Sequence, residues 1–166
     1  DFEGRYVKLD MTRSLKGKGY ELRLKVRVDN DELVGEPRSL ILSGSYVRRM
    51  IRNGTDYVED SFEVETRDNK VRVKPFLITR NKVSRAVRRE LRNKAREFIE
   101  KHIKTRTSEE IFKELMANKL QKDLSLKLKK VYPLALCEIR SFEVVGDKEE
   151  EVKEKKVDKK EDEPLA

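Results

Sequence analysis

The residues of this sequence with the clearest binding chemistry are the arginines of the run RNKVSRAVRRELRNKAR, from Arg80 to Arg96. Each residue of an α-helix advances about 100° around the axis, so a helical run can be sorted into faces. Like charges one turn apart destabilise a helix by roughly 0.2–0.5 kcal/mol per pair, so an external anion is expected to compensate. One face carries five arginines, of which the first four have no carboxylate three or four residues away: Arg85, Arg88, Arg89, Arg92 and Arg96.

The other two faces of the same run carry ion pairs and an apolar stripe. One of them pairs Glu90 with Lys94 and Glu97 with Lys101, which is the favoured order for ion pairs one turn apart. The charges are therefore sorted by face rather than interleaved, which favours an anionic partner over a solvated surface helix. The remaining face is apolar and suits packing on a core, and it carries Val83, Val87, Leu91, Ala95 and Phe98.

Phosphate is the anion that these arginines suit best, because a guanidinium grips two phosphate oxygens at once and stays charged. The aromatic residues fall mostly at core-facing positions, so we expect contacts to phosphates rather than stacking on bases. Neutralising about five phosphates would make the logarithm of the binding constant fall against that of the salt concentration with a slope of roughly −3.5 to −4.5. The predicted RNA-binding residues are Arg80, Lys82, Arg85, Arg88, Arg89, Arg92, Arg96, Arg48, Arg49, Arg52 and Lys74.

The composition suits one basic domain followed by a charged tail. The chain has 166 residues, of which 43% are charged and 36% hydrophobic, and its net charge is +8. From Asp147 onward, nine acidic and six basic residues give −3, which leaves +11 for residues 1–146 and favours a polyanionic partner. Residues 147–166 hold too few apolar side chains to offset the entropy of ordering, so we expect a disordered tail, with a solvated single helix as the alternative.

Residue types that catalyse reactions or bind metals are scarce in this sequence. His102 shares the apolar face of the arginine run and Cys137 has apolar neighbours, so both are expected at the core rather than as a general base and a reactive thiol. One cysteine and one histidine exclude an internal disulfide and a cysteine- or histidine-rich zinc site. We therefore expect no enzyme, no cofactor, no metal site and no small-molecule substrate.

The hydrophobic runs are too short for a transmembrane helix, and no signal peptide precedes the first strand, so we expect a soluble intracellular protein. Binding to a membrane surface would turn the apolar face of the arginine run toward lipid and leave a sheet uncovered. No membrane partner is therefore expected.

Strands are predicted at both ends of the domain and in its middle. Residues 20–28, YELRLKVRV, alternate between apolar side chains and the charged Glu21, Arg23, Lys25 and Arg27, which is typical of a half-buried strand. Further strands are expected near residues 5–11 and 38–44, and a hairpin joins 61–66 to 70–79 over Asp68-Asn69. Pro75 indicates an edge strand or a bend. A closing strand follows Pro133, and its nonalternating start, residues 134–137, is expected to be buried on both faces.

Helices are predicted between these strands. Ser45 suits the cap of a short helix over residues 46–52, whose outer side carries one of the two arginine clusters. Thr107 or Ser108 suits the start of a helix, and another is expected over residues 119–131. Together with the arginine run, these elements predict an α+β fold with an antiparallel, β-barrel-like sheet flanked by three to four helices.

The order of several segments resembles a known family. The segments are YVRRMIRNG, FEVETRDNKVRVKPFLITR, the arginine run and KKVYPLALCEIRSFEV. In this order they resemble the archaeal and eukaryotic small-subunit ribosomal protein family S-three-a-e, also called e-S-one, over roughly residues 5–145. The most specific pieces are Val71 to Thr79 and Tyr132 to Arg140, whereas the hairpin turn departs from the Asp-Gly that is common in the family.

This resemblance implies a structural constituent of the small ribosomal subunit, and therefore a cytoplasmic, ribosomal location. It implies small-subunit rRNA and neighbouring ribosomal proteins as partners on the platform, with mRNA near the exit as a further partner. The basic helix from Asn81 to Arg96 would be a main rRNA contact, and the compact core favours an archaeal origin. The arginines by themselves leave a second interpretation open, a regulatory RNA-binding module outside the ribosome.

Overall fold

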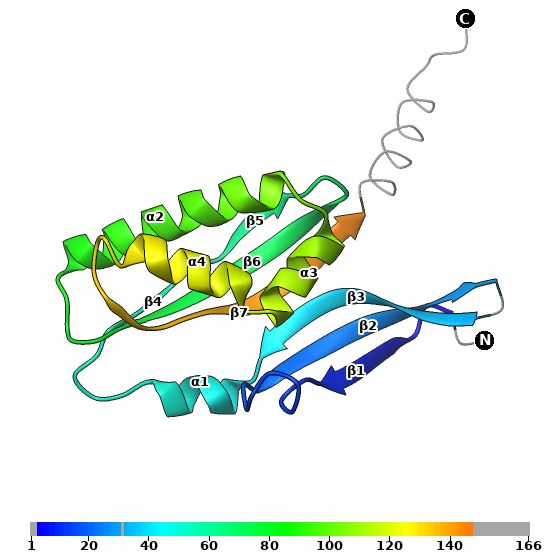
Figure 1. Cartoon of the computed structure of the whole chain (residues 1–166), viewed down its shortest axis with the longest axis horizontal. Coiled ribbons are helices and arrows are strands. Elements are labelled where there is room, and N and C mark those ends of the chain that lie inside the picture. The colour runs from blue at the N-terminus through cyan, green and yellow to red at the C-terminus, as the bar shows by residue number, and fades with distance from the viewer. Residues whose placement is uncertain (1–2, 31, 148–166) are drawn as a thin grey trace, which may run out of the picture.

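A computed structural model describes residues 3–30 and 32–147, which form one sheet with helices on one of its faces (Figure 1). The strands are β1 (Tyr6–Asp10), β2 (Tyr20–Asp29), β3 (Glu32–Leu42), β4 (Tyr57–Glu59), β5 (Phe62–Glu65), β6 (Asn69–Thr79) and β7 (Leu134–Asp147). The helices are α1 (Gly44–Met50), α2 (Arg85–Lys104), α3 (Ser108–Met116) and α4 (Lys119–Leu128). The predicted disordered tail falls, apart from Asp147, outside the described residues.

The sheet that the structure describes is antiparallel throughout, in the order β1-β2-β3-β7-β6-β4, with β5 paired to β6 beside β4. The predicted fold class is therefore confirmed. The sheet remains open, because β1 forms one edge while β4 and β5 form the other. The last described strand, β7, lies in the middle of the sheet between β3 and β6.

The strand register produces one apolar row and one polar row, each running across six strands. Directly opposed residues of antiparallel strands point to the same face, so each row belongs to one face. The apolar row consists of Leu9, Leu22, Leu40, Phe142, Val73 and Phe62. The polar row consists of Lys8, Arg23, Ser39, Glu143, Arg72 and Glu63. Such alternation is typical of a sheet with one covered and one solvated face.

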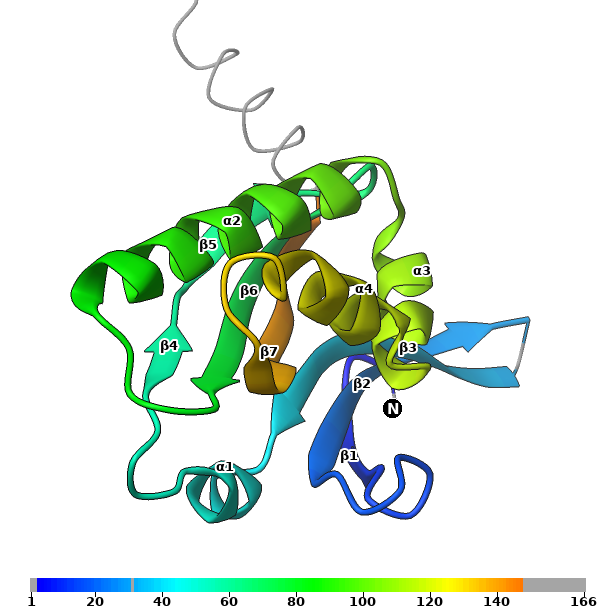
Figure 2. The same ribbon diagram turned by 60° about the vertical axis from the view of Figure 1, so that its left-hand side comes forward.

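The covered face carries α2, α3 and α4, as Figure 2 shows from a second direction. The ring of Phe112 in α3 meets that of Phe142 edge-on, with the centroids 4.9 Å apart, so the apolar row is the one beneath the helices. α2 contacts β4 and β5 and turns a stripe inward whose members are at most 1% exposed: Leu91, Ala95, Ile99 and Ile103. Fully burying a leucine or isoleucine stabilises a fold by about 1.5–3 kcal/mol, so this stripe fixes which face of α2 turns outward.

α2 begins later than the sequence pattern indicates. Its first residue is Arg85, because the side-chain oxygen of Ser84 caps the helix by accepting a hydrogen bond from the Val87 N–H at 3.4 Å. The predicted apolar face is confirmed at its centre, whereas Val83 precedes the helix and Phe98 is only half-buried. The buried side chains of α2 are spaced four residues apart, from Leu91 to Ile103, and four residues are slightly more than one helical turn. The buried stripe therefore rotates gradually around the helix and away from Phe98.

The other helices lie close to their predicted ranges. α1 is capped by Ser43 rather than Ser45, since the Ser43 Oγ atom accepts a hydrogen bond from the Tyr46 N–H at 3.3 Å. α3 is capped by Thr107, and Glu110 completes a reciprocal capping box, as its position in the first turn favours. α4 covers the predicted third helical stretch but ends at Leu128.

The predicted hairpin is formed by β5 and β6, with Phe62 opposite Val73 and Val64 opposite Val71. Its turn lies one residue earlier than expected, because the Thr66 N–H donates to the Asn69 carbonyl oxygen at 2.8 Å and encloses residues 67–68.

Pro75 does not mark an edge strand, since β6 is paired on both sides. β5 pairs with β6 as far as Val73 and β4 pairs with it from Phe76 onward, so Lys74 and Pro75 fall in the gap between them. The register with β7 also shifts between Lys74 and Pro75. This gap and this irregularity accommodate a residue that has no N–H to donate.

Two predictions of burial are wrong, one on β2 and one at the start of β7. Val28, on the apolar side of β2, is 42% exposed because the β2–β3 hairpin extends beyond the helices. Residues 134–137 are not buried on both faces, since Ala135 is exposed and its neighbours are half-buried. The partner strand is buried on both faces at this place, since Phe76, Leu77 and Ile78 of β6 are at most 2% exposed, so the exposure is confined to β7 itself.

Candidate nucleic-acid interface

The outward face of α2 carries four arginines that the structure leaves without counterions. Arg85, Arg89 and Arg92 are exposed and Arg88 is half-buried. Their side chains make no ion pair or hydrogen bond with any residue that the structure describes. The other side of α2 packs on the sheet, so these guanidinium groups stay available to an external anion. The arrangement can bind successive phosphates of a nucleic-acid backbone.

Arg96 differs from the other arginines of this face. Its Nε atom donates to Glu100 Oε1 at 2.8 Å, and its guanidinium lies over the ring of Phe62 in β5, 5.2 Å from the centroid. The hydrogen bond to Glu100 raises the pKa of Arg96 above its usual value. Arg96 therefore helps to seat α2 on the sheet, and its charge already has a counterion within the molecule.

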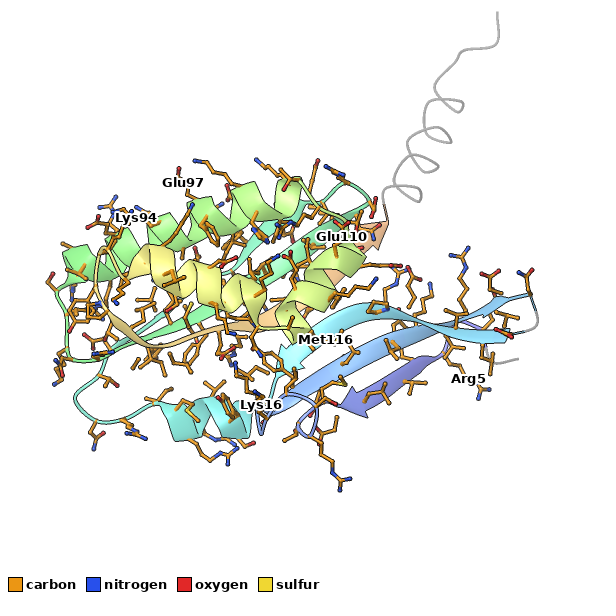
Figure 3. All side chains as sticks on the ribbon, in the orientation of Figure 1. Arg5, Lys16, Lys94, Glu97, Glu110 and Met116 are labelled. Atoms are coloured by element: carbon orange, nitrogen blue, oxygen red, sulfur yellow. The ribbon has the colours of Figure 1, made fainter. Side chains whose placement is uncertain are left out.

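The carboxylates of α2 form the ion pairs predicted from their spacing. Lys94 lies 2.6 Å from Glu90 and Lys101 lies 2.6 Å from Glu97. Figure 3 shows Lys94 and Glu97 on the outer side of α2, away from the sheet. These acids are engaged on their own face of the helix, so they do not neutralise the arginine face.

The loop before α2 adds two predicted cations, since Arg80 and Lys82 are both exposed. It leads to the N-terminus of the helix, the positive end of its dipole, and the first turn contains no acidic residue. Asp56 fixes the loop, because its Oδ2 atom accepts a hydrogen bond from the Val83 N–H at 2.9 Å. A helix N-terminus flanked by cations favours a phosphate group, so the loop extends the arginine face of α2.

The remaining predicted residues lie elsewhere on the molecule. Arg48, Arg49 and Arg52 are exposed on and just after α1, and Figures 1 and 2 both show α1 at the opposite side of the molecule from α2. Lys74 is half-buried and lies opposite Ser141 on the helix-free face of the sheet. The structure therefore brings together the residues of α2 and its preceding loop, but not the α1 cluster or Lys74.

The groups that a catalytic site would need have structural roles. His102 Nε2 lies 2.7 Å from Glu114 Oε2, and its side chain is 11% exposed, as expected of a core-edge histidine. Burial raises the pKa of the half-buried Cys137 thiol to about 12, which keeps it protonated at neutral pH. Among residues 3–30 and 32–147, no three His, Cys, Asp or Glu side chains are grouped in a way that would hold a metal ion. None of the described helices is long and apolar enough to span a membrane.

Several basic residues of the helix-free face were missed by the sequence prediction. Lys8, Arg23 and Lys25 lie together there, and Lys8 is directly opposite Arg23. The signal was present in the alternation of residues 20–28, which puts the charged side chains of β2 on one face. The sequence pattern predicts the strands β1 and β2 but not their register, on which the pairing of Lys8 with Arg23 depends.

The family model described as the Ribosomal S3Ae family matches residues 4–148 of the chain, which include nearly all of the described residues. The chain belongs to this family. It is 28% identical over 144 residues to the small ribosomal subunit protein eS1 of Nanoarchaeum equitans, which covers 84% of this chain and 73% of the relative. It is 29% identical over 141 residues to eS1 of Methanothermobacter thermautotrophicus, covering 81% of this chain and 72% of that protein. With eS1 of Methanobrevibacter smithii, the identity is 27% over 149 residues, or 86% and 77% of the two chains.

Membership of this family confirms the resemblance seen in the order of the segments. The three relatives come from archaea, in agreement with the predicted archaeal origin. A ribosomal protein family consists of structural components rather than enzymes, which agrees with the scarcity of catalytic residue types.

Proposed function

We propose that the chain is a structural constituent of the small ribosomal subunit in the cytoplasm, and that it binds small-subunit rRNA through the outward face of α2. Two findings support this proposal: the family is one of ribosomal proteins, and its relatives bear the name of a small-subunit protein. The observation that carries the binding site is the row of four α2 arginines without counterions among the described residues. A row of unpaired cations on a folded domain favours a polyanion such as rRNA.

The location that we propose is the platform near the mRNA exit, with neighbouring ribosomal proteins as partners and mRNA as a further contact. A crosslinker attached at position 89 of α2, followed by sequencing of the crosslinked RNA in assembled subunits, tests this placement. We expect crosslinks to the 3′ region of the small-subunit rRNA. Crosslinks confined to another part of the subunit would contradict the placement on the platform while leaving the arginine face as an rRNA contact.

The decisive experiment is charge reversal on the arginine face with Arg85→Glu, Arg89→Glu and Arg92→Glu. Because the native arginines repel one another, the variant should fold with an unchanged or higher melting temperature. It should nevertheless fail to enter small subunits, as measured by sedimentation. The matched control is Lys104→Glu, Lys122→Glu and Lys129→Glu, which makes the same change of charge at exposed lysines of α2 and the α4 region that form no ion pair among the described residues. Normal incorporation of the arginine variant would remove the assigned role.

A regulatory RNA-binding module outside the ribosome would use the same unpaired arginines. The two functions differ in stoichiometry, because a ribosomal constituent approaches one copy per small subunit and a regulator does not. Quantitative mass spectrometry of purified subunits measures this ratio. We expect a value near one, together with dissociation only at high salt.

A further inference from the structure

The helix-free face of the sheet carries a second basic surface, far from the arginine face of α2. We call it the sheet surface and define it by residues of β1, β2 and β3: Tyr6, Lys8, Arg23, Lys25, Arg27 and Arg38. α2 contacts β4 and β5 at the other edge and on the other face. The two basic surfaces therefore look in opposite directions.

The register of β1 and β2 concentrates positive charge on this surface. Lys8 lies directly opposite Arg23, and Tyr6 lies directly opposite Lys25, so the four side chains form two adjacent cross-strand pairs. Like charges in direct opposition destabilise a sheet, which makes the Lys8–Arg23 pair unfavourable in the isolated protein. An anion bound between the two side chains would remove this repulsion.

The sheet surface is hollowed rather than flat. One hollow of about 590 Å³ is lined by Tyr6, Lys8, Arg23, Lys25 and Arg38, together with Ser39 and residues 143–146. A second hollow, of about 580 Å³, is lined by Lys25, Arg27 and Arg38 and by neighbouring residues of the same strands. Because Lys25 and Arg38 line both hollows, the two adjoin and form a groove across β1, β2 and β3.

The cations of the groove are mostly without counterions in the part of the chain that the structure describes. Lys8, Arg23, Lys25 and Arg27 make no ion pair there, and the Nε atom of Arg23 is buried without a hydrogen-bond partner. Arg23 as a whole is half-buried and lines the first hollow, so its positive charge stays partly open to an anion in the groove.

Three glutamates line the groove, namely Glu3, Glu36 and Glu143, and Glu36 lies directly opposite Lys25 in the strand register. Glu36 pairs with Arg38 at 3.2 Å, and Glu143 accepts a hydrogen bond from the Ser141 hydroxyl at 2.6 Å. Asp10 accepts one from the Thr12 N–H at 2.8 Å. The exposed Glu3 and Glu21 remain, and Glu3 lines only the second hollow. A carboxylate that accepts a hydrogen bond from a hydroxyl or an N–H keeps its charge, so the balance of the lining is five Lys and Arg side chains against three Glu side chains, which leaves a net charge of +2.

Tyr6 distinguishes this surface from the arginine face of α2. Its side chain is 64% exposed beside Lys8 and Lys25, whereas Phe98 of α2 is half-buried beneath Lys127. A groove that combines cations with an exposed aromatic ring suits single-stranded nucleic acid, because the ring stacks on a base while the cations hold the phosphates. A rigid duplex keeps its bases stacked inside and would use only the cations.

We infer that this groove binds a single-stranded RNA segment, with phosphates on Lys8, Arg23, Lys25 and Arg27 and one base stacked on Tyr6. The protein then holds two RNA segments at once, one on each side of the sheet. Binding in the groove does not require the proposed role of α2, since the two surfaces share no residue, whereas the simultaneous holding of two segments rests on that role.

The test measures binding of a labelled single-stranded oligouridylate by fluorescence anisotropy over a range of KCl concentrations. The groove variant is Lys8→Gln, Arg23→Gln and Lys25→Gln, in the full chain. Losing three phosphate contacts should make the slope of log K against log salt shallower by about 2, since each contact contributes roughly 0.7 for a single strand. If loss of Arg23 lowers the melting temperature, the Lys8→Gln and Lys25→Gln pair alone should make the slope shallower by roughly 1.4.

The matched control is Lys113→Gln, Lys122→Gln and Lys129→Gln, which removes the same charge from α3 and the α4 region. An equal change of slope in this control would show that net charge alone is sensed and would overturn the inference. An unchanged slope in the groove variant would overturn it as well. A third contrary result would be tighter binding of an acidic peptide than of RNA with the same number of charges, which would make the groove a protein-binding surface.

Tyr6→Leu tests the stacking contact. It should weaken binding of the single strand about fivefold or more with little change in salt dependence, and it should leave binding of duplex RNA unchanged. Equal weakening for both RNAs would contradict a stacked base.

A bridging experiment separates this inference from the function proposed for α2. Duplex RNA fixed to a surface should capture labelled oligouridylate only when the protein is present, and the groove variant should retain the duplex but lose the capture. If the proposed role of α2 fails, the Arg85, Arg89 and Arg92 variant will still bind duplex, while the slope measured for the groove remains unaffected. If the wild-type protein binds each RNA but never both, the simultaneous holding of two segments is wrong.

Discussion

His102 in α2 and Glu114 in α3 are joined side chain to side chain, with the His102 Nε2 atom 2.7 Å from Glu114 Oε2. Arg106, between the two helices, also contacts this carboxylate. His102 lies in the last turn of α2, and Glu114 lies near the C-terminal end of α3. The contact therefore connects the helix that bears the arginine face to the helix that packs on Phe142.

This contact predicts a loss of stability in acid. Burial by itself would raise the pKa of Glu114, but the hydrogen bond with His102 and the charges of His102 and Arg106 hold it below the usual 4.5. A carboxyl group with a lowered pKa in the folded state contributes stability above its unfolded pKa and loses it as the pH falls below about 4.5. Glu114→Gln should cost about 1–3 kcal/mol at pH 7 and distinctly less at pH 3. Urea unfolding at both pH values measures the difference, and a cost that does not change with pH would contradict the assignment.

The buried ion pair between Lys18 and Glu138 predicts a larger and more local effect. Lys18 Nζ lies 2.5 Å from Glu138 Oε1 and also donates to Asn118 Oδ1 at 2.7 Å. The Tyr20 hydroxyl lies 3.1 Å from the other oxygen of the same carboxylate and 2.9 Å from the Ile139 carbonyl oxygen, so it keeps an acceptor when Glu138 is removed. The Lys18 ammonium group then loses its counterion, so Glu138→Ala should cost about 3 kcal/mol. A double-mutant cycle with Lys18→Met, measured by urea unfolding, should give a coupling of about 0.5–3 kcal/mol. A coupling near zero would show that the pair has no mutual effect.

Cys137 should be unreactive in the folded protein. Burial, followed by the charge of Glu138, raises the pKa of its thiol to about 12, so at pH 8 only about one molecule in ten thousand carries the thiolate. Iodoacetamide at pH 8 should label the native protein very slowly and the urea-unfolded protein at the rate of an ordinary cysteine. Rapid labelling under native conditions would mean that this part of β7 opens readily.

The stripe that seats α2 can be separated from its binding face by mutation. Ile99 is 0% exposed, so Ile99→Ala should lower the free energy of unfolding by about 2–5 kcal/mol. Lys101→Ala, whose side chain is 75% exposed, should change it by at most about 0.5 kcal/mol. Neither change should alter the salt slope of RNA binding, because neither side chain belongs to the arginine face. If the Ile99→Ala variant is fully folded and still gives a shallower salt slope, the position of α2 itself sets the affinity.

Local patterns predicted the elements well because their causes are local. Three such features appear in the structure close to their predicted places: the arginine run, the alternation in β2 and the cap at Thr107. Each depends only on residues that are close to one another in the sequence. Arg85, Arg88, Arg89 and Arg92, which have no carboxylate one turn away in the sequence, also form no ion pair with any described residue of the fold. Arg96 did not follow the same pattern, since its second partner, Phe62, is distant in sequence.

Contacts between segments that are distant in the sequence could not be predicted from it. Nothing local to β1 shows that Lys8 lies opposite Arg23, and nothing local to α1 shows that its arginines lie far from those of α2. Pro75 was assigned to an edge or a bend because a missing donor is expensive in a paired strand, yet the neighbouring β4 and β5 leave a gap for it. In each case the deciding fact is which strands become neighbours, and a single sequence does not encode that in its spacing.

The central position of β7 has a consequence for biosynthesis. β3 and β6 meet only through this strand, which is translated after every other element of the sheet. A nascent chain that has not yet emerged beyond residue 134 therefore exposes two incomplete sheet edges, which are prone to pair with other chains. The sheet should thus be completed late in synthesis, and a truncation that removes residues 134–147 should yield aggregates rather than a smaller soluble domain.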